Sequence, residues 1–143
     1  MKISTKGRYA LRLMVDLASW PHEEYISVKS IADRQGISEK YLEQIIKLLA
    51  SENLVESVRG KQGGYRLTRD AKNYTVGEIL RVTEGSLAPV VCLEGDENTC
   101  EYCLDCITVE IWQKILDAVN DVVDSITLQY LVDKQKEKGN TGC

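Results

Sequence analysis

Two short amphipathic segments separated by one glycine, within residues 27–52, constrain the fold of this chain more than any other feature. Ser27 and Ser38 stand where helix N-caps are expected, since a serine oxygen can accept a hydrogen bond from a free N–H of the first turn. They predict one helix up to Gln35 and, after Gly36, a second helix from about Glu39 to Glu52. A helix, a glycine turn and a second helix are typical of the helix-turn-helix, whose second helix lies in the major groove of DNA.

The second of these helices is expected to have one apolar and one polar face. The apolar face, which we expect to be buried, consists of Leu42, Ile45, Ile46 and Leu49. The polar face, which we expect to be exposed, consists of Lys40, Glu43, Gln44 and Lys47.

A glycine-rich basic hairpin is predicted directly after the second helix. Residues 54–58 and 65–68 have the composition of strands. Arg66 and Arg69 lie in or after the return strand, and the turn between the strands contains Arg59, Gly60, Lys61, Gly63 and Gly64. Such a wing places an arginine in the minor groove and backbone amides against phosphates. An ordinary solvated hairpin has a similar composition, but the order of the elements favours a DNA-binding wing.

The charge distribution also favours an anionic partner for the first half of the chain. Residues 1–72 contain 13 lysines and arginines against 9 acidic residues, whereas residues 73–143 contain 5 against 13. No apolar run approaches the roughly 18 residues of a membrane span, and the first residues lack the apolar stretch of a signal peptide. We therefore expect a cytoplasmic protein with no membrane partner.

Further helices are expected on both sides of this region. Residues 6–20, ended by Pro21, and residues 74–82 have helical spacing, and a long apolar stripe runs from Thr108 to about Val132. A lone long helix at the end of a small domain favours packing on a second copy about a twofold axis, in addition to its own domain. The expected homodimer interface consists of Ile111, Ile115, Val119, Val122 and Ile126.

Cysteines are concentrated just before this long helix. The segment contains Cys92 and then Cys100, Cys103 and Cys106, with acidic residues around them. In a cytosolic chain such a cluster indicates metal binding or redox chemistry. The CxxCxxC spacing suits an iron–sulfur cluster, and four cysteines could equally form a zinc site. With His22 as the one histidine and no acid–base pair, an enzyme is not expected.

Several of these segments together resemble the Rrf-type winged-helix transcription regulators. The IscR-like branch of this family contains iron–sulfur cluster regulators, the NsrR-like branch nitric-oxide sensors and the CymR-like branch repressors of cysteine metabolism. This chain looks most like the IscR-like branch. The resemblance covers about residues 1–133, and its motifs are residues 4–9, 31–38, 41–44, 54–60, 63–65, 76–79 and 126–128.

The resemblance implies a dimer that binds a palindromic operator in double-stranded DNA. It makes Glu39 to Lys47 the major-groove helix and Arg59 the minor-groove residue, with backbone contacts near the N-terminus. The complete DNA-binding set expected from the motifs and the resemblance is Ser4, Lys6, Arg8, Ser38, Glu39, Lys40, Tyr41, Glu43, Gln44, Lys47, Arg59, Gly60, Lys61, Gly63 and Gly64.

The resemblance also implies an iron–sulfur cluster ligated by cysteines. In IscR-like members the fourth ligand is a histidine three residues after the last cysteine, a position that Val109 occupies here. A site of Cys92, Cys100, Cys103 and Cys106 is the simple solution, and three cysteines with another ligand is the alternative; a two-iron and a four-iron cluster both remain open. Further alternatives are zinc, a bare-thiol switch, or a CymR-like repressor controlled by a partner protein.

The predicted fold is mainly α with a small β wing: a winged helix-turn-helix domain followed by a long C-terminal dimerisation helix. The expected divisions are a DNA-binding domain over 1–84, a cysteine-bearing cluster loop over 85–107, the dimerisation helix over 108–133 and a flexible tail over 134–143.

Overall fold

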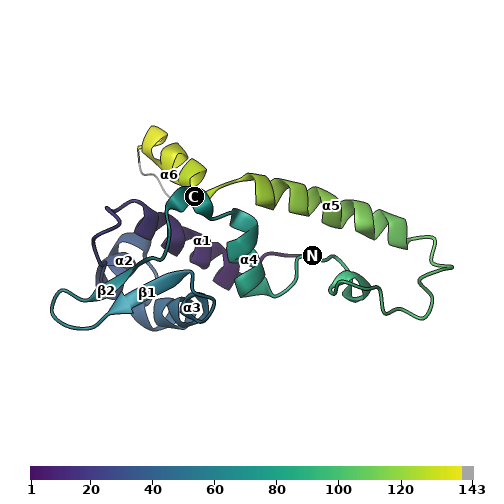
Figure 1. Cartoon of the computed structure of the whole chain (residues 1–143), viewed down its shortest axis with the longest axis horizontal. Coiled ribbons are helices and arrows are strands. Elements are labelled where there is room, and N and C mark those ends of the chain that lie inside the picture. The colour runs from purple at the N-terminus through teal and green to yellow at the C-terminus, as the bar shows by residue number, and fades with distance from the viewer. Residues whose placement is uncertain (140–143) are drawn as a thin grey trace.

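A computed structural model describes residues 1–139, which form six α-helices and one two-stranded sheet (Figure 1). Two single 3₁₀ turns, Ala71–Asn73 and Val91–Leu93, complete the regular structure of these residues. The elements in chain order are α1 Thr5–Ala18, α2 Val28–Gln35, α3 Glu39–Ser51, β1 Val55–Val58, β2 Gly64–Leu67, α4 Val76–Glu84, α5 Val109–Ser125 and α6 Leu128–Glu137. The predicted fold class, mainly helical with a winged helix-turn-helix, is confirmed.

Serine and threonine caps set where most of the helices begin. Ser27 Oγ accepts a hydrogen bond from Ser30 N, and Ser38 Oγ accepts one from Tyr41 N, both at 3.2 Å. Thr75 caps α4 in the same way. Gly36 ends α2 with a φ of 65°, a left-handed conformation that favours glycine. The predicted helix starts at Ser27 and Ser38 and the glycine turn are therefore confirmed.

The core is formed where α1, α2, α3 and α4 meet. The apolar face of α3 is buried, as the sequence predicts, and its polar face is exposed. The largest side chains with almost no exposed surface include Leu13, Met14, Ile31, Leu42, Ile45, Leu49 and Ile79. Burying each of these contributes about 1.5–3 kcal/mol relative to exposure. This packing holds α3 rigidly with its polar face outward.

The wing is an antiparallel pair in which Val55 faces Leu67 and Val58 faces Gly64. A third segment joins it, because Ile26 and Tyr65 exchange two backbone hydrogen bonds of 2.8 Å. Gly64 lies against this segment: a Cβ there would be 2.5 Å from the carbonyl carbon and oxygen of Ile26. This pairing was not predicted, and it ties the turn end of β2 to the segment just before α2.

The predicted single helix from Thr108 to Val132 is wrong in one respect. α5 ends at Ser125, Ile126 is extended, and Thr127 caps a separate helix, α6. Leu128 and Val132 are buried, and α6 packs on α1, so the chain returns to the N-terminal core. Residues 134–137 of the predicted tail belong to α6, and the flexibility of the tail stays a prediction. Its last residues, with Cys143, lie outside the described residues.

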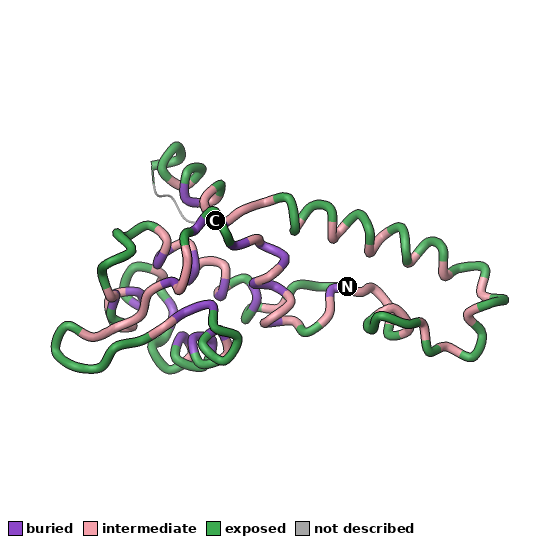
Figure 2. Tube along the Cα trace, viewed as in Figure 1, coloured by how far each residue is buried: buried purple, intermediate pink, exposed green. Residues whose placement is uncertain are grey.

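α5 projects away from the rest of the fold, and the cysteine segment runs outward from α4 to the far end of α5 (Figure 1). No residue of α5 is buried, and Figure 2 shows no buried stretch along either α5 or the cysteine segment. The divisions expected at residues 84, 107 and 133 stay a prediction.

Candidate nucleic-acid interface and cysteine segment

The exposed face of α3 carries five polar side chains that make no hydrogen bond or ion pair with any described residue: Glu39, Lys40, Glu43, Gln44 and Lys47. Two carboxylates, two ammonium groups and one amide leave this face with no net charge. It is therefore better suited to reading donors and acceptors on base edges than to general attraction by phosphates.

Tyr41 and Ser38 have structural tasks at the start of α3. The Tyr41 ring is half-buried and meets the ring of Tyr9 edge-on, with 5.8 Å between centroids. Arg12 lies 5.4 Å from the Tyr9 ring, so α1 supports this corner of α3. Ser38 uses its oxygen as the helix cap.

The basic residues of the wing divide into two pairs. Arg59 and Lys61 are exposed at the tip, and neither bonds to any residue within 1–139. Arg66 instead donates to Glu56 at 2.6 Å and lies over Tyr25, while Arg69 lies over Tyr74 and pairs with Glu78. Arg59 and Lys61 are thus free for a ligand, whereas Arg66 and Arg69 stabilise the hairpin.

Glycine is required at two places in this turn. Gly60 has a φ of 119°, a backbone conformation that is strained for any residue with a Cβ. A Cβ at Gly63 would lie 2.3 Å from Val58 O.

The three N-terminal residues of the predicted DNA-binding set differ in whether their side chains are already bonded within the chain. Ser4 Oγ caps α1 by accepting from Gly7 N, and it donates to Glu84 Oε1 at 2.6 Å. The Ser4 hydroxyl is therefore used within the chain. Lys6 and Arg8 are exposed, and Arg8 contacts Thr5 at 3.3 Å on the surface.

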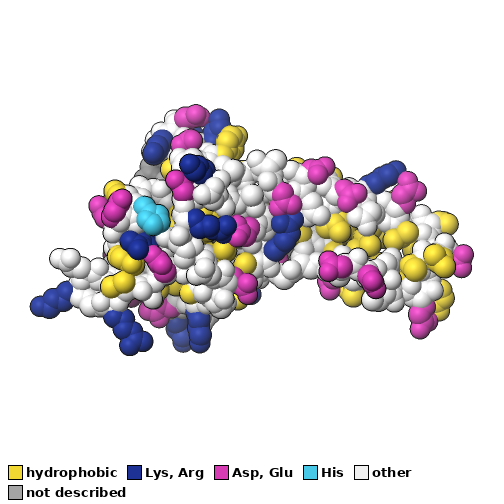
Figure 3. Space-filling model, viewed as in Figure 1, with side chains coloured by type: hydrophobic (Ala, Val, Ile, Leu, Met, Phe, Trp, Pro, Cys, Tyr) yellow, Lys and Arg dark blue, Asp and Glu magenta, His cyan; other side chains and the backbone are white. Residues whose placement is uncertain are grey.

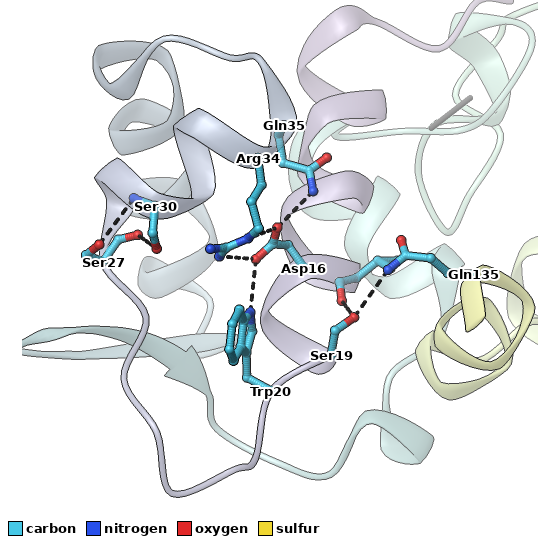
Figure 4. A network of polar contacts seen from close by, with 9 residues as sticks. Asp16, Ser19, Trp20, Ser27, Ser30, Arg34, Gln35 and Gln135 are labelled. Carbon is cyan, nitrogen blue, oxygen red and sulfur yellow. Dashed lines mark hydrogen bonds and ion pairs between the residues drawn. The ribbon is translucent and has the colours of Figure 1, made fainter. Parts of the chain in front are cut away.

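A buried carboxylate, which sequence reasoning did not single out, joins α1 to α2 (Figure 4). Asp16 is 5% exposed. Arg34 donates to both Asp16 oxygens, at 3.1 and 2.8 Å, and Gln35 Nε2 donates at 2.8 Å. Trp20 covers this network, with Arg34 4.9 Å from its ring. The available signal was a charged residue between Leu13 and Leu17 on the buried face of α1. The network fixes the helix-turn-helix on α1.

Charge is unevenly distributed over the molecule. Figure 3 shows lysine and arginine side chains projecting at the end that carries the wing and α3, whereas acidic and apolar side chains cover the end that carries α5 and the cysteine segment. The first end can attract a polyanion and the second cannot.

The cysteine segment exposes several large apolar side chains to solvent. Tyr102 is 73% exposed, Leu104 95% and Ile107 92%. Five acidic residues lie among them, and all are exposed: Glu94, Asp96, Glu97, Glu101 and Asp105. A surface this apolar is typical of one that another chain or a structural change covers.

The four predicted ligands, Cys92, Cys100, Cys103 and Cys106, are half-buried free thiols. Thiolates suit iron–sulfur clusters and zinc. However, the described histidine, cysteine and acidic residues nowhere form a group of three able to hold a metal ion. The thiols are thus suitable ligands for an iron–sulfur cluster or zinc, but their positions in this structure do not form a site for either. Thr108 Oγ1 lies 3.4 Å from Cys106 Sγ, and this hydrogen bond lowers the pKa of the Cys106 thiol.

The five expected interface residues do not share one environment. Ile111 and Val122 are exposed at 52% and 57%, and Ile115 is half-buried. Val119 and Ile126 pack instead against a small cluster of Val76, Leu80 and Leu87. The helix therefore packs partly on its own chain and leaves part of its apolar surface free.

Comparison with known proteins gives consistent matches. A model of the Rrf2 family, described as an iron-dependent transcriptional regulator, matches residues 3–134. The chain is 45% identical to the transcriptional regulator CymR of Bacillus subtilis over 131 residues, 92% of this chain and 89% of that protein. It is 37% identical to the regulator IscR of Erwinia tasmaniensis over 136 residues, 95% of this chain and 81% of that protein.

Solved structures agree. The structure of CymR, the global cysteine regulator of B. subtilis, matches with a TM-score of 0.76 and 42% identity, covering 94% of this chain and 98% of that one. IscR of T. potens matches with a TM-score of 0.75 and 40% identity, covering 100% and 93%. Among residues 1–139, no helix is both long and apolar enough to cross a membrane.

Proposed function

Because this chain belongs to the Rrf2 family of transcriptional regulators, we propose that two copies of it bind a palindromic operator and that the cysteine segment controls this binding. DNA-binding regulation is the function of the family. The exposed, unpaired side chains of α3 and the wing tip, which sit on the basic end of the molecule, are the observation that supports this use of the fold.

In the proposed complex α3 lies in the major groove. Gln44 can pair with adenine, and Glu43 can accept from cytosine N4 while repelling phosphates. Arg59 enters the adjacent minor groove, where the potential is most negative. Lys6, Arg8, Lys40, Lys47 and Lys61 attract phosphates, and the amides near Gly60, Gly63 and Gly64 approach the backbone. Ser4 and Ser38 contribute by fixing the helix starts.

The homodimer is proposed to form through α5. Ile111, Ile115 and Val122 present a stripe that the chain itself leaves uncovered, and a twofold axis would pair it with its copy. Each protomer would then present one α3 to one operator half-site.

The cysteine segment is proposed as the sensor, because it connects α4 of the DNA-binding part to α5. An iron–sulfur cluster held by Cys92, Cys100, Cys103 and Cys106 is the first candidate. Since the described residues do not gather these donors, no step of the DNA response is assigned to a bound group. Zinc, bare thiols, or a regulatory partner protein of a CymR-like member are the other candidates.

Two measurements test this function. Duplexes selected from a random-sequence library should converge on an imperfect palindrome; a selection without any consensus would contradict operator binding. Anaerobic purification with an absorption spectrum and iron, sulfide and zinc analysis tests the sensor. We expect brown protein with iron and acid-labile sulfide, lost in Cys92→Ala and Cys106→Ala. Colourless protein with stoichiometric zinc would reject the cluster, and protein with neither would leave bare thiols or a partner protein.

A further inference from the structure

One buried hydroxyl closes the base of the wing. The Tyr74 side chain has no exposed surface, and the residue lies between the 3₁₀ turn Ala71–Asn73 and α4. Its hydroxyl donates to Leu54 O at 2.7 Å and accepts from Thr68 N at 3.0 Å and Arg69 N at 3.2 Å. Leu54 immediately precedes β1 and Thr68 immediately follows β2, so the hydroxyl joins both open ends of the hairpin.

This hydroxyl is fully used. A tyrosine hydroxyl offers one donor and two acceptor positions, and all three are occupied by backbone groups of the hairpin ends. A phenylalanine would fill the same core volume, so packing alone does not call for the oxygen. A buried hydroxyl is tolerated only when it is paired in this way. The three hydrogen bonds of the Tyr74 hydroxyl therefore indicate that its role is to hold the ends of the hairpin.

Neighbouring groups reinforce the same junction. Thr68 Oγ1 donates to Asn53 O at 2.8 Å, and Arg69 lies 4.2 Å from the Tyr74 ring. Tyr74 is itself held from the opposite side, because its carbonyl accepts from Leu128 N at 3.0 Å. The residue is thus anchored to α6 by its backbone and to the wing by its side chain.

The wing tip has no comparable support. Arg59 and Lys61 are exposed and bond to none of the residues from 1 to 139. The hairpin is four residues long on each side, and a two-stranded hairpin of this size is marginal alone. Its orientation is therefore set by two contacts, the pairing of Tyr65 with Ile26 and the Tyr74 hydroxyl at the open ends of the hairpin.

We infer that Tyr74 is a positioning residue for the wing: its hydroxyl fixes the direction in which Arg59 and Lys61 meet DNA. This inference rests on the proposed function, in which the wing contacts the operator. Tyr74 touches no DNA itself and acts through the backbone at Leu54, Thr68 and Arg69.

The test is a double-mutant cycle of Tyr74→Phe and Arg59→Ala, measured as affinity for the duplex selected from a random library by the unaltered protein. We expect each single change to weaken binding roughly tenfold, in line with the loss of one hydrogen-bonded anchor or one groove contact. We expect the double variant to lose less affinity than the product of the two single losses, because only the Lys61 contact then remains for Tyr74→Phe to misplace. Tyr130→Phe, which removes an exposed tyrosine hydroxyl of α6, should leave affinity unchanged.

Multiplicative losses in the double variant would overturn the inference, because Tyr74 would then act independently of the wing. Unchanged affinity in Tyr74→Phe would overturn it as well. If Tyr74→Phe does not fold, Thr68→Val serves as a milder change in the cycle: it removes the hydroxyl that lies 3.0 Å from the Tyr74 hydroxyl and bonds to Asn53 O, while the three backbone bonds of Tyr74 remain. A smaller loss of affinity is then expected, and it should again combine with Arg59→Ala less than multiplicatively.

A measurement without DNA separates this inference from the proposed function. Amide hydrogen exchange of residues 55–67 should accelerate in Tyr74→Phe while that of α1 does not change. If the unaltered protein selects no consensus duplex, operator binding fails, yet accelerated exchange would still show that Tyr74 holds the wing. Equal exchange in both proteins would overturn the positioning role whatever the DNA result.

Discussion

Arg81 of α4 holds Asp124 of α5 with two guanidinium nitrogens, at 2.7 Å from Oδ1 and 2.9 Å from Oδ2. Arg81 also donates to Asn120 at 2.8 Å. Gly77 lies beneath this pair, and a Cβ there would be 2.1 Å from Asp124 Oδ1. The angle at which α5 leaves the DNA-binding part is therefore fixed by a polar clamp in addition to the small apolar cluster of Val76, Leu80 and Leu87.

Asp124→Asn should loosen this clamp. The Arg81 hydrogen bond lowers the pKa of Asp124, so the charged form stabilises the folded state. Both side chains are more than a third exposed, and solvent screening limits the loss to about 0.5–1 kcal/mol. Urea denaturation at neutral pH measures it, and the exposed Asp117→Asn on α5 is the matched control.

The same pair predicts a pH dependence. Because the folded-state pKa of Asp124 is depressed, its contribution is complete above the ordinary aspartate pKa of about 3.9 and disappears as the pH falls through the folded value. The stability difference between the unaltered protein and Asp124→Asn should therefore shrink on acidification below about pH 4. A difference that grew in acid would contradict this assignment.

Asp16→Asn should be more damaging. The Asp16 side chain is 4% exposed and Arg34 is 35% exposed, so loss of the charge leaves a partly buried guanidinium without its carboxylate. We expect a loss of about 2 kcal/mol in the free energy of unfolding, measured in urea. Asp33→Asn, on the exposed side of α2, should cost far less; equal losses would show that the buried network is not special.

Gly64→Ala should disturb the wing. The added Cβ meets the Ile26 backbone, which cannot move aside as a side chain can. We expect about 2 kcal/mol of destabilisation, with faster amide exchange at Tyr65 and Ile26. Gly95→Ala is the control, because its nearest atom is at 3.8 Å and no clash results.

Lys40→Ala should weaken binding to the selected duplex and reduce the slope of log affinity against log salt by about 1. Glu43→Ala should instead alter the preferred bases with little change in that slope. Fluorescence anisotropy at several salt concentrations distinguishes the two. Lys114→Ala on α5 serves as the distant control; a similar slope change there would remove Lys40 from the interface.

Ile111→Glu and Val122→Glu should lower the mass observed by light scattering from a dimer to a monomer, because each places a charge on the uncovered stripe of α5. Each variant should keep the folded helical signal, since neither side chain is buried in its own chain. A dimer that survives both changes would show that the interface lies elsewhere.

Local chemistry made much of this fold predictable. Ser27, Gly36 and Ser38 act on backbone groups within a few residues, and the structure confirms them. The break after Ser125 was missed because Leu131 and Val132 continue the apolar period of α5, while Thr127, a serviceable cap, was the unused signal.

Long-range pairings were beyond local reasoning. The contact of Gly64 with Ile26 and the bonds of Asp16 with Arg34 join residues that only the folded chain brings together. Ser4 illustrates the same limit, since its link to Glu84 spans the whole DNA-binding part. The placement of the four cysteines likewise follows from the path of an irregular segment and not from their spacing.

The return of α6 to α1 changes what counts as a unit in this molecule. Leu128 and Val132 complete a core that begins at α1, so the cysteine segment and α5 form an insertion between two parts of one body. A fragment ending at Glu84 would lack part of its own interior. Evolution can lengthen or shorten the insertion at a modest entropic cost, because closing a longer loop costs only about 0.6 kcal/mol per doubling. The cysteine segment and the DNA-binding part can therefore diversify separately, provided that α6 keeps its place.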